Sequence, residues 1–263
     1  ATIIADFFIQ SAGNDYQTWR DEQLQLIEQL GRNVEQSLKQ ERKTGTLVSQ
    51  KTTESILAKL ENKTVISFGA TTLTIQVGTL SDAKLSNDSA FVLPANTTFA
   101  DDCVTDGKSA LGSFFKEHHE NKIPTFAQEL QKILLSQNIK PSNGTDYLPG
   151  TVLILPEEYS IKSKVILVAS SMRSKNKGFH TNPSLISNSI YNIFKTTADK
   201  RINTFYFPII GSGHAGLEHT DALNLLILCI KFSAKEFNHV KNVFIFVRDI
   251  DSKKVKANFI NSF

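Results

Sequence analysis

A glycine-rich segment between an expected strand and an expected helix is the residue pattern in this sequence best suited to chemistry. It reads Phe207-Pro-Ile-Ile-Gly211-Ser-Gly-His-Ala-Gly216. Glycine leaves backbone N–H groups unshielded and permits positive φ angles, so successive amides can turn toward one point. The helix that follows adds the positive potential of its N-terminus. We therefore predict that the segment binds a phosphate or diphosphate; the alternative is a tight, closely packed strand-to-helix turn.

Three familiar motifs do not fit this segment. A P-loop ends in Gly-Lys-Ser/Thr, whereas Ala215-Gly216-Leu217 stands here. A Rossmann site usually opens its domain and has an acidic residue about 20 residues later. Here the segment comes late, and the next expected strand ends near Arg248. Gly211-Ser212-Gly213 also lacks the spacing of a G-x-S-x-G nucleophile elbow.

A second candidate is the end of the apolar run Phe91-Val-Leu-Pro-Ala95-Asn96. A carboxamide donates and accepts hydrogen bonds at once, which suits the hydroxyl pair of a ribose. The alternative is an asparagine that caps the next turn. The sequence leaves both interpretations of Asn96 open.

Histidine and cysteine give weaker candidates. His118 and His119 are adjacent and point to different faces of an expected helix, so we predict a solvated helix end and no metal site. Cys103 is expected to be a small, half-buried residue; the alternative is a reactive thiolate, because Lys108 and a possible helix N-terminus lie near it. Cys229 lies in an apolar helix and is expected in the core.

The elements expected around these residues form an α/β pattern. Strands are expected at residues 64–68, 72–77, 90–94, 151–155, 164–169, 203–207 and 242–247. Helices are expected at 109–119, at 125–135 with a Thr125–Gln128 capping box, from the Asn182-Pro183 pair, and at 219–235. The first two strands have no helix between them, which indicates antiparallel pairing at one edge. We predict a three-layer α/β/α fold with a mixed, mostly parallel sheet.

The chain before this pattern is expected to be helical. Ile27, Leu30, Val34 and Leu38 recur at the spacing of an amphipathic helix, and Thr53–Leu60 is a second, shorter candidate. We assign residues 1–63 to an accessory helical segment and residues 64–263 to the main domain. The accessory segment is expected to be a packing appendage, with a linker or a homo-oligomerisation element as the alternative.

Composition excludes several classes of protein. The 263 residues are 40% hydrophobic and 21% charged, with a net charge of +3 and scattered lysines, so we expect no nucleic-acid partner. The longest apolar run, Ala222–Phe232, is too short to cross a bilayer. No basic residue precedes the apolar start, and the two cysteines form no framework, so a cytoplasmic setting is expected. Membrane attachment is expected only if further residues precede Ala1.

The order of the motifs resembles that of a macro domain, the ADP-ribose-binding α/β/α fold. The resemblance covers roughly residues 64–250. It rests on Val77-Gly78-Thr79-Leu80, Val92–Asn96, the strand Val165–Ala169 and Phe207–Gly216, in that order. It implies a small-molecule nucleotide as ligand, with no further cofactor and no metal.

The resemblance also implies roles for these segments. Gly211–Gly216 would wrap the diphosphate, Asn96 would lie beside the distal ribose, and Gly78–Leu80 would hold adenine. The ligand-binding residues implied in this way are Gly78, Thr79, Leu80, Asn96, Asp102, Cys103, Val104, Lys108, Ser109, Ile210, Gly211, Ser212, Gly213, His214, Ala215, Gly216 and Arg248.

Two segments depart from the usual macro domain pattern. Thr79 stands where the family usually has an aspartate that reads the adenine amino group. The loop 97–109 contains a single glycine, Gly107, where the family is glycine-rich, so we expect a reshaped pocket. The Asp-rich loop after Asn96 is similar to that of divergent bacterial macro domains, some of which sense ADP-ribose-type signals in Thoeris antiphage defence.

These departures favour a sensor of ADP-ribose or of a modified ADP-ribose. An amino-acid conjugate would suit the loop, because Asp101, Asp102 and Asp106 could meet an amino group and Lys108 a carboxylate. The alternative is an ADP-ribosylhydrolase that uses Asn96 with Asp102 or Asp106. A third hypothesis is an interaction protein with a degenerate pocket.

One substitution separates these hypotheses. In a sensor, Gly213→Val would abolish ligand binding, because a β-branched side chain blocks the approach to the backbone and disfavours positive φ. In an interaction protein with a degenerate pocket, the same change would leave function intact.

Overall fold

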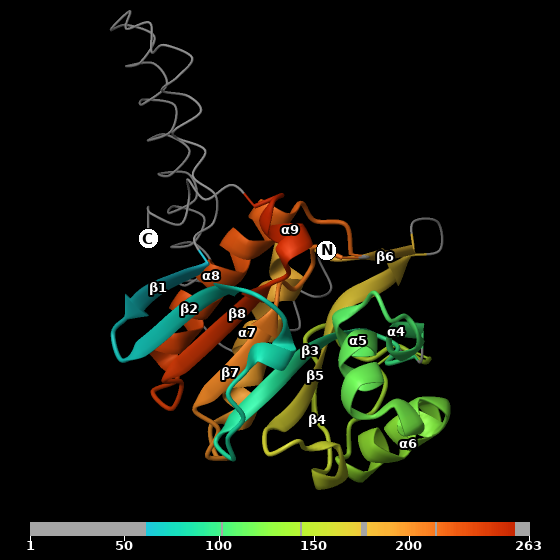
Figure 1. Cartoon of the computed structure of the whole chain (residues 1–263). Coiled ribbons are helices and arrows are strands. Elements are labelled where there is room, and N and C mark those ends of the chain that lie inside the picture. The colour runs from blue at the N-terminus through green and yellow to red at the C-terminus, as the bar shows by residue number, and fades with distance from the viewer. Residues whose placement is uncertain (1–61, 101, 143, 175–177, 214, 256–263) are drawn as a thin grey trace, which may run out of the picture. The chain divides into compact units, whose positions relative to one another are not determined.

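The computed structural model describes residues 62–255, except for 101, 143, 175–177 and 214 (Figure 1). The expected helices at residues 15–60 lie outside the described residues. The proposed role of this segment in oligomerisation lies outside them too and stays a prediction.

Within the described residues, the strands form one mixed sheet in the order β1-β2-β8-β7-β3-β5-β4, with β6 paired to β5. Neighbours from β2 to β5 are parallel, whereas β1, β4 and β6 run antiparallel to their partners. The strands are β1 (Lys63–Phe68), β2 (Thr71–Val77), β3 (Ser89–Asn96), β4 (Val152–Ile154), β5 (Lys164–Ser174), β6 (Gly178–His180), β7 (Thr204–Pro208) and β8 (Asn242–Val247).

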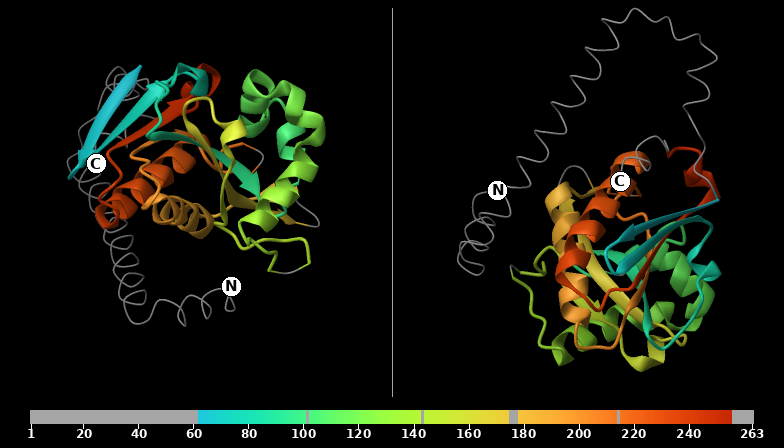
Figure 2. Two further views of the ribbon diagram at one scale, coloured as in Figure 1. Left: turned by 90° about the horizontal axis from the view of Figure 1, so that it is seen from below. Right: turned by 90° about the vertical axis from the view of Figure 1, so that its left-hand side faces the viewer.

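Helices cover both faces of the sheet, as Figures 1 and 2 show. They are α4 (Asp102–Thr105), α5 (Ala110–His118), α6 (Ile123–Ser136), α7 (Pro183–Thr197), α8 (His219–Glu236) and α9 (Asp249–Ser252), with short 3-10 turns η1 (Leu80–Asp82), η2 (Glu120–Lys122) and η3 (Glu157–Tyr159). The apolar sides of α7 and α8 pack on one face and those of α5 and α6 on the other.

The alternation of side chains along each central strand separates the two cores. Val92 packs under α7 and α8, whereas its neighbours Phe91 and Leu93 pack under α5 and α6. Ile166 and Leu167 divide in the same way on β5. Both faces of the central strands are therefore buried, which explains their nearly continuous apolar sequence. The prediction of a three-layer fold with a mixed sheet is confirmed.

The predicted antiparallel pair at one edge is confirmed as β1 and β2, and β4 also runs antiparallel to β5 at the other edge. The Thr125 capping box is wrong: α6 begins at Ile123, and the Thr125 hydroxyl instead donates to the carbonyl of Lys122 and to Glu129. By contrast, the Asn182 cap is confirmed, since its side-chain oxygen accepts from the Leu185 amide at 2.9 Å.

The buried His119 and the half-buried His239 predict a loss of stability at mildly acidic pH. The expectation that His119 lies at a solvated helix end is wrong, because its side chain is buried. Burial lowers the pKa of His119, whose Nε2 donates to the Tyr159 carbonyl at 3.0 Å, and it also lowers the pKa of His239. Both therefore remain neutral in the fold, while the unfolded chain takes up protons below about pH 6.5. Their stabilisation is complete above that pH and is lost as the pH falls toward the lowered native values.

We expect the Tm to fall between pH 7.5 and 5.5, which differential scanning fluorimetry at half-unit steps would measure. Carboxylates with lowered pKa values, such as Glu129, titrate below this window. The double variant His119→Gln, His239→Gln should flatten the profile. An equal decline in the wild type and the double variant would contradict this explanation.

Candidate functional site

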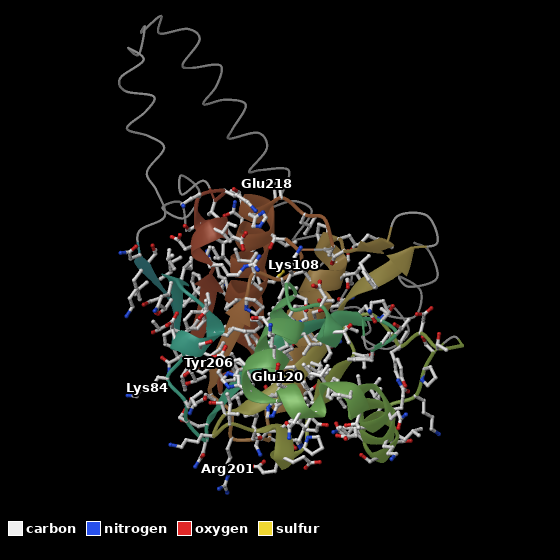
Figure 3. All side chains as sticks on the ribbon, turned by 45° about the vertical axis from the view of Figure 1, so that its right-hand side comes forward. Lys84, Lys108, Glu120, Arg201, Tyr206 and Glu218 are labelled. Carbon is white, nitrogen blue, oxygen red and sulfur yellow. The ribbon has the colours of Figure 1, made fainter. Side chains whose placement is uncertain are left out.

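The carboxyl ends of four parallel strands bring the sequence-predicted segments to one edge of the sheet. In spatial order these strands are β2, β8, β7 and β3, and they are followed respectively by residues 78–80, Arg248, residues 209–217 and residues 97–109. Figure 3 shows Lys108 and Glu218 toward this end of the domain, with Lys84 and Arg201 toward the opposite end. Ligands of open α/β sheets bind at the carboxyl ends of strands.

Among its described residues, the glycine-rich loop is held by two internal backbone hydrogen bonds and by one from the Ser212 hydroxyl to the Ile209 carbonyl at 3.3 Å. The amide of Leu217 donates to the carbonyl of Gly211 at 3.0 Å, and that of Gly216 donates to the carbonyl of Gly213 at 3.1 Å. Within the described residues, the amides of Ser212 and Gly213 have no such partner. A closed loop whose described amides include unused donors is suited to binding an anion.

The glycines of this loop have different roles. Gly211 and Gly216 have positive φ values of 96° and 81°, as expected for glycines that enable the turn. The expectation of positive φ at Gly213 is wrong, and a Cβ added there would meet no heavy atom within 4 Å. Gly213 therefore faces open space, whereas a Cβ on Gly211 would lie 2.9 Å from Cδ1 of the buried Ile186. The side chain of Ile210 is itself part of the core.

The helix that follows the loop does not offer its first turn to a ligand, contrary to expectation. Helix α8 begins at His219, and the Glu218 carboxylate accepts from the amides of Thr220 and Asp221 at 2.8 and 3.3 Å. A carboxylate at this position satisfies the amides and offsets the positive helix potential. Any phosphate held here would therefore depend on the loop amides.

Asn96 is completely buried at the end of β3. Its Oδ1 accepts from the amide of Thr98 at 3.0 Å, from the hydroxyl of Thr98 at 2.7 Å and from the amide of Ala100 at 3.4 Å. The side-chain oxygen thus caps the turn that starts the 97–109 loop, which is the second of the two roles that the sequence left open.

The rest of this loop packs against a glycine that sequence reasoning missed. A Cβ on Gly112, in the first turn of α5, would lie 2.2 Å from the Asp106 carbonyl oxygen and 2.8 Å from that of Val104. The side chain of Val104 is buried in the α5–α6 core, while Ser109 caps α5 by accepting from the Gly112 amide at 2.8 Å. No periodic pattern reveals a glycine that is required by a neighbouring loop.

The segment after β2 is closed by an acidic residue that the sequence reading did not single out. The amide of Gly78 donates to the Val247 carbonyl at 2.9 Å, and the amide of Thr79 donates to Asp82 at 2.8 Å. A Cβ on Gly78 would lie 2.6 Å from the same carboxylate. The carboxylate of Asp82 therefore lies beside Gly78 and Thr79.

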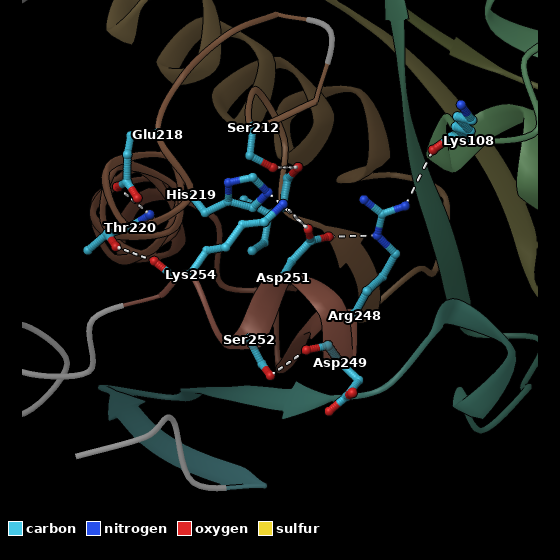
Figure 4. Close-up of polar contacts among 11 residues, drawn as sticks. Lys108, Ser212, Glu218, His219, Thr220, Arg248, Asp249, Asp251, Ser252 and Lys254 are labelled. Carbon is cyan, nitrogen blue, oxygen red and sulfur yellow. Dashed lines mark hydrogen bonds and ion pairs between the residues drawn. The ribbon is translucent and has the colours of Figure 1, made fainter. Parts of the chain in front are cut away.

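Arg248 links α9 to the 97–109 loop. Its Nε donates to Asp251 at 2.6 Å and its Nη1 donates to the Lys108 carbonyl at 3.4 Å (Figure 4). The backbone amide of Lys108 in turn donates to the Asp106 carboxylate at 3.0 Å. The structure thus places Arg248 and Lys108 together at the candidate site. The backbones of Asp102 and Cys103 lie in α4 of the same loop, and His214 lies outside the described residues.

Other sequence candidates lie apart from this edge. Cys229 is buried in α8, and burial raises the pKa of its thiol to about 12, which makes it unreactive. Among the described residues, no three His, Cys, Asp or Glu side chains group as metal ligands would. Over the same part of the chain, none of the helices combines the length and the hydropathy that a bilayer span requires.

Comparisons with known proteins agree with this geometry. The Oceanobacillus iheyensis macrodomain with ADP superposes with a TM-score of 0.55 and 16% identity, covering 76% of this chain and 96% of that one. The Trypanosoma brucei macrodomain in complex with ADP-ribose gives 0.51 and 13%, covering 72% and 68%. At these identities the likeness establishes the fold alone.

A comparison with curated proteins gives no significant match. The family described as "Thoeris protein ThsA, Macro domain" matches residues 73–248, which is more than half of the chain and includes the whole candidate edge. This chain therefore belongs to the family of Thoeris ThsA macro domains.

Proposed function

We propose that the chain binds ADP-ribose or a modified ADP-ribose as a sensor module, with a role in antiphage defence. The observation that carries the proposal is the pair of unpartnered amides at Ser212 and Gly213, in a closed loop at the carboxyl edge of the sheet. The ligands of the two macrodomains above, ADP and ADP-ribose, both contain a diphosphate. The ThsA family supports the defence role.

The chemistry of the edge suits such a ligand. Amides fixed by the Leu217 and Gly216 hydrogen bonds are already oriented, so little conformational entropy is lost when a diphosphate binds. In strand order, residues 78–80 lie on one side of β7 and residues 97–109 on the other. We infer that the base binds near Gly78–Leu80 and that the distal ribose, with any amino-acid substituent, meets the loop that contains Asp102, Asp106 and Lys108.

A hydrolase remains the second candidate, and the geometry at Asn96 makes us rank it lower. The Asn96 side-chain oxygen accepts three hydrogen bonds from its own loop, which supports a structural role for this residue. The assay that separates the candidates is release of ADP-ribose from a modified protein by the wild type and by Asn96→Ala. Binding without release favours the sensor, whereas release that is lost in Asn96→Ala favours the hydrolase.

Isothermal titration calorimetry with ADP-ribose tests the proposal directly. We expect saturable binding to the full chain, and stronger binding to a conjugate that fits the 97–109 loop. Adenosine, which lacks phosphate, is the matched ligand control and should bind far more weakly. The absence of heat from ADP-ribose and its amino-acid conjugates at high micromolar concentration would reject the proposal.

A further inference from the structure

Asp251, in the short helix α9, is a buried carboxylate paired with two cationic side chains and a histidine. The side chain is 8% exposed. Its Oδ2 accepts from Arg248 Nε at 2.6 Å, while its Oδ1 lies 3.1 Å from His219 Nε2 and 3.3 Å from Lys254 Nζ (Figure 4). A buried carboxylate is tolerated when both of its oxygens are paired in this way.

The ionisation of Asp251 follows from these contacts. Burial raises the pKa of the carboxyl, but the hydrogen bond and charge of Arg248 outweigh it together with the Lys254 hydrogen bond and a last contribution from His219, so the net pKa is lowered. The group is therefore a carboxylate at neutral pH and attracts the Arg248 guanidinium with a full charge.

Arg248 lies where two parts of the candidate site meet. It directly follows β8, which lies between β2 and β7 in the sheet. Residues 78–80 follow β2 and the glycine-rich loop follows β7, so Arg248 is placed between the segments expected to hold the base and the phosphates. Its side chain is 56% exposed although Nε and Nη1 are bonded to Asp251 and Lys108.

We propose that Asp251 is a positioning residue, which fixes the Arg248 guanidinium so that its exposed N–H groups meet the adenosine-diphosphate half of the ligand. The proposal rests on the proposed function, because it assumes nucleotide binding at this edge. Two fixed contacts, one to Asp251 and one to the Lys108 carbonyl, define the plane of the guanidinium. A planar group held at two points loses little freedom when it binds a third partner.

The first test is the affinity of Asp251→Asn for ADP and for ADP-ribose, measured by calorimetry. The substitution keeps the shape of the side chain and removes its charge. We expect a loss of about tenfold in affinity, and an equal loss for both ligands because Arg248 contacts the part that they share. Asp249→Asn is the matched control: it lies in the same helix, removes the same charge and pairs with Lys253 at 3.8 Å.

The second test is a double-mutant cycle with Arg248→Ala. Because Asp251 acts through Arg248, adding Asp251→Asn to Arg248→Ala should change affinity no further. Arg248 is half-exposed, so Arg248→Lys should not impair folding. It should lose affinity as Asp251→Asn does, since lysine keeps the positive charge but lacks the planar guanidinium with its several N–H donors.

Three results would overturn the proposal. These are wild-type affinity in Asp251→Asn or Arg248→Lys, a further loss in the Arg248→Ala background, and a loss that appears with ADP-ribose but not with ADP. If the wild type binds neither nucleotide, the proposed function itself fails. If the wild type binds but one of the three results above is found, only the role proposed for Asp251 fails.

Discussion

Gly213→Val is expected to weaken ADP-ribose binding by at least about a hundredfold and to leave the Tm nearly unchanged. The Gly213 amide has no hydrogen-bond partner among the described residues, and a branched side chain at this position would occupy the space that a phosphate needs. Two hydrogen bonds to a charged group contribute about 3 kcal/mol or more, which corresponds to about two powers of ten in affinity. Calorimetry and thermal unfolding measure the two effects.

The contrast with Gly211→Ala makes this test specific. Gly211 has a φ of 96°, and its added Cβ would lie 2.9–3.1 Å from the side chains of Ile186, Leu217 and Thr181, so the substitution strains the fold itself. It should lower the Tm, by the equivalent of about 1–3 kcal/mol. Asn238→Val, at an exposed turn outside the candidate site, is the neutral control. Tight binding by Gly213→Val would show that the loop amides do not hold the ligand.

Gly112→Ala is expected to destabilise the protein by about 3 kcal/mol, although the same change stabilises an ordinary helix by up to about 1 kcal/mol. The new methyl group would lie 2.2 Å from the Asp106 carbonyl oxygen and 2.7 Å from its carbon, and both are backbone atoms. The 97–109 loop must therefore move away from α5. Urea unfolding at neutral pH measures the change in free energy, and calorimetry shows whether ligand binding is lost with it.

Ser113→Ala, at the exposed next position of α5, provides the control. It should behave as the wild type in both experiments. If Gly112→Ala instead raised stability, the close packing of the loop on α5 would be absent in solution, and the loop would have to be placed differently.

Local sequence patterns predicted those parts of the fold that local interactions determine. The strand at residues 242–247 matches β8 at both ends, and α8 begins at the expected residue, His219. Asn182 followed by Pro183 marked the start of α7 correctly, because the cap and the proline both act within one turn. The expected antiparallel pair at one edge also formed, as β1 and β2.

The features that sequence reasoning missed depend on partners distant in the chain or on very short elements. Thr125 satisfied a capping-box pattern, yet α6 continues from the preceding turn η2, so no helix start exists there. Helix α9 has four residues, which is too short for periodicity to show. The role proposed for Asp251 depends on Arg248, which reaches the Lys108 carbonyl 140 residues away in the sequence. The order of the motifs nevertheless predicted the candidate edge, because the carboxyl ends of neighbouring parallel strands lie at the same edge of a sheet.

The Glu218 cap has a consequence for how this domain can diverge. Since α8 satisfies its own first turn, the proposed recognition of an anion would depend on main-chain amides, which every residue type except proline possesses. Residues at positions such as Ser212 and Ala215 could then be substituted, provided that the new side chains do not block access to the loop amides. In the proposed function, discrimination among nucleotides would then depend on the residues after β2, β3 and β8, which can change without altering the loop amides.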